Sequence, residues 1–178
     1  MTPEIAWQHS IYDIPERGLA RELNAAPDEL ERVARALELI ACRSLAVAYT
    51  IEPASQGRFR LSGKLEAEIV QSCVVTLEPV SSIVTETYEA MFWPPDAMPP
   101  PKSGELDLDD MPDPEPIEND QIAVGRVVFE CLAAAIDPFP RAPGAALDWQ
   151  PPADQEQAGE GRESPFAVLA KIKTKTQT

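Results

Sequence analysis

An alternating pattern of apolar residues over positions 43–95 constrains the fold more than any other feature of the chain. The pattern includes Leu45, Val47, Tyr49 and Ile51, and after a turn at residues 53–57 it continues through Phe59, Leu61, Leu65, Ala67 and Ile69. This period of two is typical of β-strands that bury one face. A third run at residues 83–93 follows the link at residues 73–82, and its less regular pattern indicates two partly covered faces or a bulge. We predict an antiparallel meander of these three strands.

The remaining periodic segments predict two further strands and two helices. Ile5, Trp7 and Ile11 recur at even spacing before the run at residues 19–23, so the first 24 residues are interpreted as two strands. Residues 27–41 carry one apolar stripe and predict an amphipathic helix. Residues 122–136, apolar on most sides, predict a second helix, with Asp120 as its N-cap. The expected fold is α+β over residues 1–147: an antiparallel β-sheet of about five strands with two packed helices.

Two segments differ from this domain in composition. Residues 94–120 contain eight prolines, nine acidic residues and one lysine, which predicts a disordered acidic Pro-rich insert without core side chains. Residues 148–178 are expected to form a flexible tail with a candidate short helix at residues 164–171. The candidate partner-binding residues all belong to these two segments, and they are Glu105, Asp107, Asp109, Asp110, Asp113, Glu115, Phe166, Leu169, Lys171 and Lys173. The alternative for the insert is a solubilising loop, and for the tail it is docking on the domain or fraying.

Charge and cysteine usage favour a protein partner in a reducing compartment. The net charge of −15 argues against a surface that follows the phosphates of a nucleic acid and fits a basic partner better. Cys42, Cys73 and Cys131 lie far apart with no metal-ligand spacing, which is typical of reduced thiols. No signal sequence or membrane-spanning run of apolar residues is evident, so we expect a cytoplasmic protein that does not bind a membrane.

The sequence offers little that could carry catalysis. His9 is the only histidine and lies in an alternating segment without a nucleophile motif, so it is interpreted as structural. The glycines are scattered and form no phosphate-binding loop. We therefore expect no enzymatic activity, no metal site and no cofactor.

Several segments resemble the bacterial YceD-like family, the large ribosomal RNA subunit accumulation proteins, of alphaproteobacterial type. The resemblance covers residues 57–95 with the turn CVVTLEP at 73–79, residues 117–143 with GRVVFECL at 125–132, the loop PFPR at 138–141 and the tail SPFAVL at 164–169. The motif residues singled out are Cys73, Leu77, Pro79, Gly125, Glu130 and Leu132.

The chain departs from the family pattern at its cysteines. Family members commonly carry Cys-x-x-Cys at the turn, whereas Thr76 occupies the second cysteine position here. Many relatives also have cysteines in the loop after the second helix, where this chain has Arg141, Ala142, Pro143 and Gly144. A four-thiolate zinc site cannot be formed from these residues, and Cys73 is interpreted as a buried turn thiol.

The resemblance implies a non-enzymatic factor that supports large-subunit ribosomal RNA accumulation or processing and ribosome assembly. A basic ribosomal protein or an assembly intermediate is the expected partner. One alternative is a direct RNA-binding module that uses Arg58, Arg60 and Lys64 with the lysines of the tail, although Glu66 and Glu68 continue the same strand face. A second alternative is a metal or redox protein.

Overall fold

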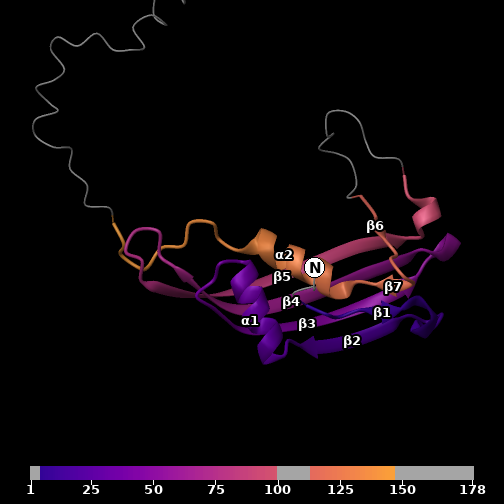
Figure 1. Cartoon of the computed structure of the whole chain (residues 1–178), viewed down its shortest axis with the longest axis horizontal. Coiled ribbons are helices and arrows are strands. Elements are labelled where there is room, and N and C mark those ends of the chain that lie inside the picture. Colours follow the sequence, from indigo (N-terminus) through magenta and orange to yellow (C-terminus); the bar gives the residue numbers. More distant parts are fainter. Residues whose placement is uncertain (1–4, 100–112, 147–178) are drawn as a thin grey trace, which may run out of the picture. The chain divides into compact units, whose positions relative to one another are not determined.

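The computed structural model describes residues 5–99 and 113–146 of the chain (Figure 1). Its longer elements are β2 (Leu19–Asn24), α1 (Pro27–Ala36), β3 (Ala41–Pro53), β4 (Phe59–Ser72), β5 (Pro79–Trp93) and α2 (Val124–Ala135). Its short elements are β1 (His9–Ser10), η1 (Ile11–Asp13), η2 (Ser55–Gly57), η3 (Pro95–Ala97), β6 (Glu115–Pro116) and β7 (Gln121–Ile122).

One five-stranded sheet, in the order β2-β3-β4-β5-β6, forms the centre of the domain. Its first four strands are antiparallel neighbours, and β6 is added parallel to β5 at Phe92 and Trp93. β1 and β7 pair separately as a two-residue ribbon. The predicted α+β class, the meander and the sheet of about five strands with two helices are confirmed. The predicted strand through Ile5, Trp7 and Ile11 is wrong, because only His9–Ser10 form a strand there and they lie outside the sheet, whose fifth strand is β6. The third strand is longer than the sequence indicated, since it begins at Pro79 rather than at residue 83.

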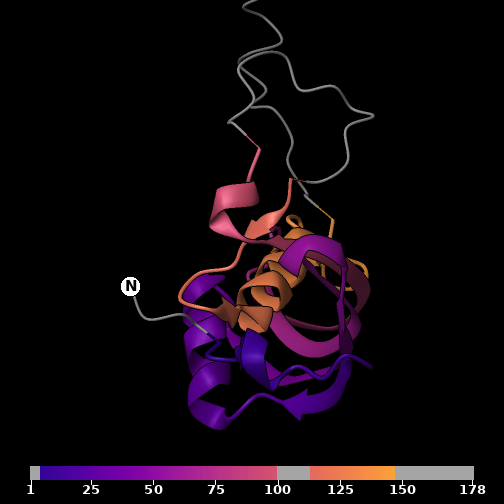
Figure 2. The same ribbon diagram turned by 90° about the vertical axis from the view of Figure 1, so that its right-hand side faces the viewer.

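The predicted alternation places one face of the sheet in the core. Rows of paired residues such as Val47–Leu65 and Ile51–Leu61 are buried on that face. Seen along the sheet, α2 lies within the curve of the strands, and it packs against β4 and β5 (Figure 2). α1 packs against β3. The opposite face carries mainly small and charged side chains, together with the exposed Ile83.

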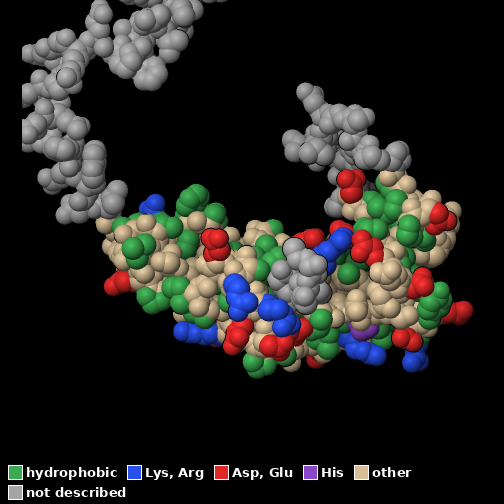
Figure 3. Space-filling view, viewed as in Figure 1, with side chains coloured by type: hydrophobic (Ala, Val, Ile, Leu, Met, Phe, Trp, Pro, Cys, Tyr) green, Lys and Arg blue, Asp and Glu red, His purple; other side chains and the backbone are tan. Residues whose placement is uncertain are grey.

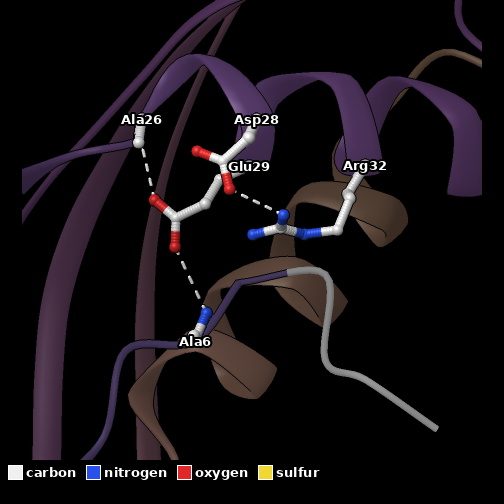
Figure 4. A network of polar contacts seen from close by, with 5 residues as sticks. All are labelled: Ala6, Ala26, Asp28, Glu29 and Arg32. Atoms are coloured by element: carbon white, nitrogen blue, oxygen red, sulfur yellow. Dashed lines mark hydrogen bonds and ion pairs between the residues drawn. The ribbon is translucent and has the colours of Figure 1, made fainter.

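α1 begins where the sequence predicted but ends earlier than residue 41. The side chain of Glu29 is buried and accepts hydrogen bonds from the N–H of Ala26, at 2.9 Å, and of Ala6, at 3.3 Å, which ties the N-terminal segment to the first turn (Figure 4). The helix ends at Ala36 because Glu38 takes a left-handed conformation, with φ 54°, and the N–H of Leu39 bonds to the carbonyl of Ala34. The expected extension to residue 41 is therefore wrong, and Ala41 starts β3.

α2 also begins later than predicted. Asp120 has φ 58° and precedes the short strand β7, so it is not the N-cap; Ala123 occupies that position. The carbonyl of Asp120 instead accepts a hydrogen bond from the N–H of Ile11, which holds the two-residue ribbon together. The apolar surface of α2 is used as expected: Val124, Val128 and Leu132 are fully buried.

The end of the acidic segment contributes to the core, contrary to the sequence-based expectation. Ile117 is 5% exposed, and its N–H bonds to the carbonyl of Trp93 at 2.9 Å. The expectation that residues 94–120 contribute no core side chain is therefore wrong for Ile117. Residues 100–112 and the tail from residue 147, with its candidate helix at 164–171, lie outside the described residues.

Candidate partner-binding site

Two loops that are about sixty residues apart in the chain meet at one end of the sheet. The first is the turn at residues 73–78 between β4 and β5, and the second is the loop at residues 137–142 after α2. The N–H of Val74 donates to the carbonyl of Pro140 at 2.9 Å, and the side-chain amide of Gln71 donates to the carbonyl of Asp137 at 2.9 Å. These bonds fix the second loop against the end of β4.

The thiol of Cys73 lies between the two loops. Its Sγ atom accepts hydrogen bonds from the N–H groups of Val75 and Thr76, each at 3.4 Å, and from the N–H of Ala142 at 3.3 Å. The side chain is fully buried, which confirms the interpretation of a buried turn thiol. The hydroxyl of Thr76, followed by the N–H of Ala142, lowers the pKa of this thiol to about 6, because hydrogen-bond donors stabilise the charged form. The sulfur atom of Cys73 accepts hydrogen bonds from both loops and therefore connects the turn to the loop after α2.

The same contact shows why these loops do not form a four-thiolate site. Thr76 and Ala142 lie against the sulfur of Cys73, and neither offers a thiolate. Within residues 5–99 and 113–146, no group of three or more His, Cys, Asp or Glu side chains is placed to hold a metal ion.

Large apolar side chains are exposed around this pair of loops. We call the surface formed by Val74, Leu77 and Phe139, the exposed apolar side chains of the two loops, the two-loop surface. Leu77 is 76% exposed and Phe139 is 69% exposed, and the space-filling view shows several hydrophobic side chains at the surface of this end of the domain, on the left of Figure 3. Ile40 belongs to the same end because its N–H bonds to the carbonyl of Val70, near the end of β4. Clustered exposed apolar side chains are typical of a protein-binding surface.

The backbone of Leu77 supports a functional interpretation of this surface. Its φ is 62°, a left-handed conformation that costs a residue with a side chain about 1–2 kcal/mol. The N–H of Leu77 bonds to the carbonyl of Cys73 at 3.0 Å, and its own carbonyl accepts from the hydroxyl of Ser72. The turn thus holds a leucine in a strained conformation with its side chain in solvent, and such strain is concentrated at functional sites.

The structure brings together only some of the residues selected from the sequence. Cys73, Leu77 and Pro79 share the turn at this end of the sheet. Gly125 and Leu132 have packing roles in α2: a Cβ atom on Gly125 would lie 2.4 Å from the carbonyl oxygen of Ile5, and Leu132 is fully buried. Glu130 lies at the edge of α2, 3.7 Å from Arg126.

The acidic and tail candidates are mostly outside the described residues. These are Glu105, Asp107, Asp109, Asp110, Phe166, Leu169, Lys171 and Lys173. Of the described pair, Glu115 forms an ion pair with Arg126 of α2, and Asp113 precedes it by two residues. Glu115 therefore attaches the end of the acidic segment to the domain and does not contribute to the two-loop surface.

Sequence reasoning did not find Val74 or Phe139 as surface residues. Their exposure depends on where two distant loops meet, which no local pattern encodes. The one available signal was the pairing of two family-like motifs, CVVTLEP and PFPR, each of which carries an apolar residue in a turn.

The polar residues of the opposite half of the sheet form local contacts rather than a reactive site. His9 Nε2 lies 2.6 Å from the hydroxyl of Tyr49, and burial lowers the pKa of His9. Arg58 stacks over the ring of Trp93 at 3.8 Å, and Arg60 pairs with Glu89 at 2.8 Å.

In the part of the chain that the structure describes, no helix is long and apolar enough to cross a membrane.

Comparison with known proteins identifies the family. The sequence model of the YceD family, described as large ribosomal RNA subunit accumulation protein, matches residues 61–173, which includes both loops of the two-loop surface. No curated protein and no solved structure shows a significant match to the chain. The description of the family implies a role in the accumulation of large-subunit ribosomal RNA. With a match over more than half of its length, the chain belongs to the YceD family.

Proposed function

We propose that this protein is a non-enzymatic assembly factor that supports large-subunit ribosomal RNA by binding a basic ribosomal protein or an assembly intermediate at the two-loop surface. The observation that carries the proposal is the gathering of exposed apolar side chains from two family-matched loops, with Leu77 held at positive φ. Partner binding that buries these side chains offsets the conformational cost of displaying them.

The charge around the surface favours a basic partner. Glu78 and Asp137 outnumber Arg141 in the two loops themselves, and the whole chain carries a net charge of −15. The acidic segment, with Glu105, Asp107, Asp109, Asp110, Asp113 and Glu115, adds long-range attraction in this proposal. Phe166 and Leu169, followed by Lys171 and Lys173, remain candidates for a second, apolar contact from the tail.

Direct RNA binding is the weaker proposal because two of the three basic strand residues that it needs are already engaged. Arg58 is stacked on Trp93 and Arg60 is paired with Glu89, which leaves Lys64 among the three strand candidates. A phosphate-tracking surface requires several unpaired cations side by side. Filter binding to large-subunit RNA over a salt series would favour this alternative only if affinity were high and fell steeply with salt.

The test is complementation of cells that lack the protein. Wild type, the double variant Leu77→Ser/Phe139→Ser and the control Tyr12→Ser are each expressed, and the ratio of large- to small-subunit ribosomal RNA is measured. Tyr12 is a matched control because it is 79% exposed and lies far from the two-loop surface. It follows β1, whose His9 contacts Tyr49 in the middle of β3. Tyr49 is separated by eight residues of extended strand from Ala41, at the end of β3 that is nearer to the two loops. That separation is about 26 Å.

We expect the wild type and the Tyr12 variant to restore the ratio and the double variant to fail at equal protein level. An unchanged ratio in cells without the protein would overturn the proposed function. Full restoration by the double variant would instead overturn the role of the two-loop surface and leave the function standing.

A further inference from the structure

The outer edge of β5 is a long strand edge without a full-length partner. β5 pairs with β4 from Pro79 to Phe92, but on its other side β6 reaches only Phe92 and Trp93 (Figure 1). Among residues 5–99 and 113–146, no other strand lies on that edge. The edge before Met91 therefore presents backbone groups that a further strand can pair with.

The hydrogen bonds of β6 show which residues of β5 face outward. The carbonyl of Trp93 accepts from the N–H of Ile117 at 2.9 Å, so Trp93 directs its backbone groups away from β4. The N–H and C=O of one strand residue lie on the same side, and the side alternates along the strand. Because the register with β4 runs from Phe92 to Pro79 without a shift, the odd-numbered residues 81, 83, 85, 87 and 89 also direct their N–H and C=O outward.

The side chains of this edge do little to prevent pairing. Natural edge strands are commonly protected by lysine, an internal proline or a bulge. Between Val80 and Trp93, β5 contains no lysine, arginine or proline, and its pairing with β4 has no bulge. Thr85 and Thr87 are exposed strand-forming residues, and Ile83 is 72% exposed.

The opposite edge of the sheet is protected where β5 is not. β2 is six residues long and carries Arg21 and Glu22, and the guanidinium of Arg21 donates to the carbonyl of Ala20 at 3.0 Å. Its short length and the guanidinium that occupies the carbonyl of Ala20 disfavour the addition of a strand. One edge of the sheet is thus protected and the other is open, so a further strand would be added at β5.

Charge decides which kind of strand fits the β5 edge. The charged side chains of β5 are Glu86 and Glu89, of which Glu89 is paired with Arg60 of β4, and the acidic segment with Glu105 and Asp107 follows the strand in the chain. A second copy added edge to edge would bring Glu86 and the acidic segment of each copy near each other, and like charges on neighbouring strands are destabilising. A strand with lysine or arginine would gain from the same groups.

We propose that the outer edge of β5 binds an extended basic segment of a protein partner by β-strand addition. The inference rests on the proposed function, since it names how the basic partner of the two-loop surface extends along the sheet. Main-chain hydrogen bonds supply affinity in this mode, and the alternate side chains supply selectivity.

Residue-resolved amide hydrogen exchange tests the geometry directly. The probe is a set of peptides of about ten residues, the length of a long strand, that tile the basic ribosomal proteins of the large subunit. In the free protein, the amides of residues 81, 83, 85, 87 and 89 should exchange quickly while the even-numbered amides, bonded to β4, stay protected. A binding peptide should slow the odd-numbered amides at least tenfold, and the same peptide with a central proline should not.

Two variants separate the edge from the rest of the surface. Thr85→Pro removes one outward N–H and leaves the bonds to β4, whereas the control Thr85→Val keeps the N–H. We expect at least tenfold weaker peptide binding for the proline variant and unchanged binding for the valine variant, with thermal unfolding confirming that both are folded. Thr87→Lys, which adds a protecting charge without altering the backbone, should weaken binding if the proline variant does not fold.

The outcomes that overturn the proposal are distinct from those that overturn the proposed function. Protection of the odd-numbered amides in the free monomer would mean that the chain covers its own edge. Protection that grows with protein concentration, with dimers in sedimentation, would assign the edge to a second copy. Binding of basic peptides without odd-numbered protection would reject strand addition, even where complementation supports the assembly function.

Discussion

Replacement of Gly125 by alanine tests how the N-terminal segment is held on α2. A Cβ atom at this position would lie 2.4 Å from the carbonyl oxygen of Ile5 and 2.9 Å from its carbonyl carbon. These are backbone atoms that no side-chain rotation can move aside. Gly125→Ala should therefore displace the backbone around Ile5, because no change of side-chain rotamer can make room for the methyl group.

The expected cost follows from the contacts of that segment. Displacement exposes Ile5, now 3% exposed, at about 2 kcal/mol. It also breaks the bond from the N–H of Gly125 to the carbonyl of Trp7 and the bond from the N–H of Ala6 to Glu29, at about 1 kcal/mol each. Alanine regains at most about 1 kcal/mol in helix propensity. The free energy of unfolding should fall by about 3 kcal/mol.

Urea denaturation of single and double variants measures this effect. Ile5→Ala should cost about 2–4 kcal/mol in the wild type. In the Gly125→Ala background it should cost close to nothing, because the side chain has already left the core. Ala133→Gly, at an exposed position of the same helix, is the control and should cost about 1 kcal/mol from propensity alone. Additive effects of Ile5→Ala and Gly125→Ala, or a stabilising Gly125→Ala, would refute the reasoning.

Two further predictions concern the Cys73 thiol and the acidic segment. The pKa of Cys73 is lowered to about 6, so the folded state holds a thiolate where the unfolded chain still holds a thiol. The resulting stability is fully present above the ordinary thiol pKa and is lost as pH falls through about 6; urea denaturation should show this pH dependence in the wild type but not in Cys73→Ala, and equal profiles would contradict the thiolate. Deletion of residues 102–112, which spares the buried Ile117, should slow association with the basic partner far more than it speeds dissociation. Stopped-flow kinetics at low and moderate salt measure this, with attraction screened beyond about 8 Å at physiological ionic strength, and an association rate indifferent to deletion and salt would leave the segment as a solubilising loop.

The sequence by itself determined the strands β2 to β5 and the class of fold. Alternation over Leu45 to Ile51 and Phe59 to Ile69 identified the buried face, because a period of two is a local property of extended chains. The two helices were likewise evident from their apolar stripes. Their ends were less accurate: α1 stops at Ala36 because Glu38, and not the usual glycine, adopts the left-handed conformation.

Only the tertiary structure decided where the candidate surfaces lie. The Cys73 sulfur and the N–H of Ala142 are brought together by the packing of α2 on β4 and β5, across a separation that local sequence patterns do not report. The burial of Ile117 likewise could not be predicted from a proline-rich acidic segment. It depends on the hydrogen bond from the N–H of Ile117 to the carbonyl of Trp93, which places this residue beside β5. The open edge of β5 is a consequence of strand order, and strand order is set by which strands complete the shared core rather than by any one of them.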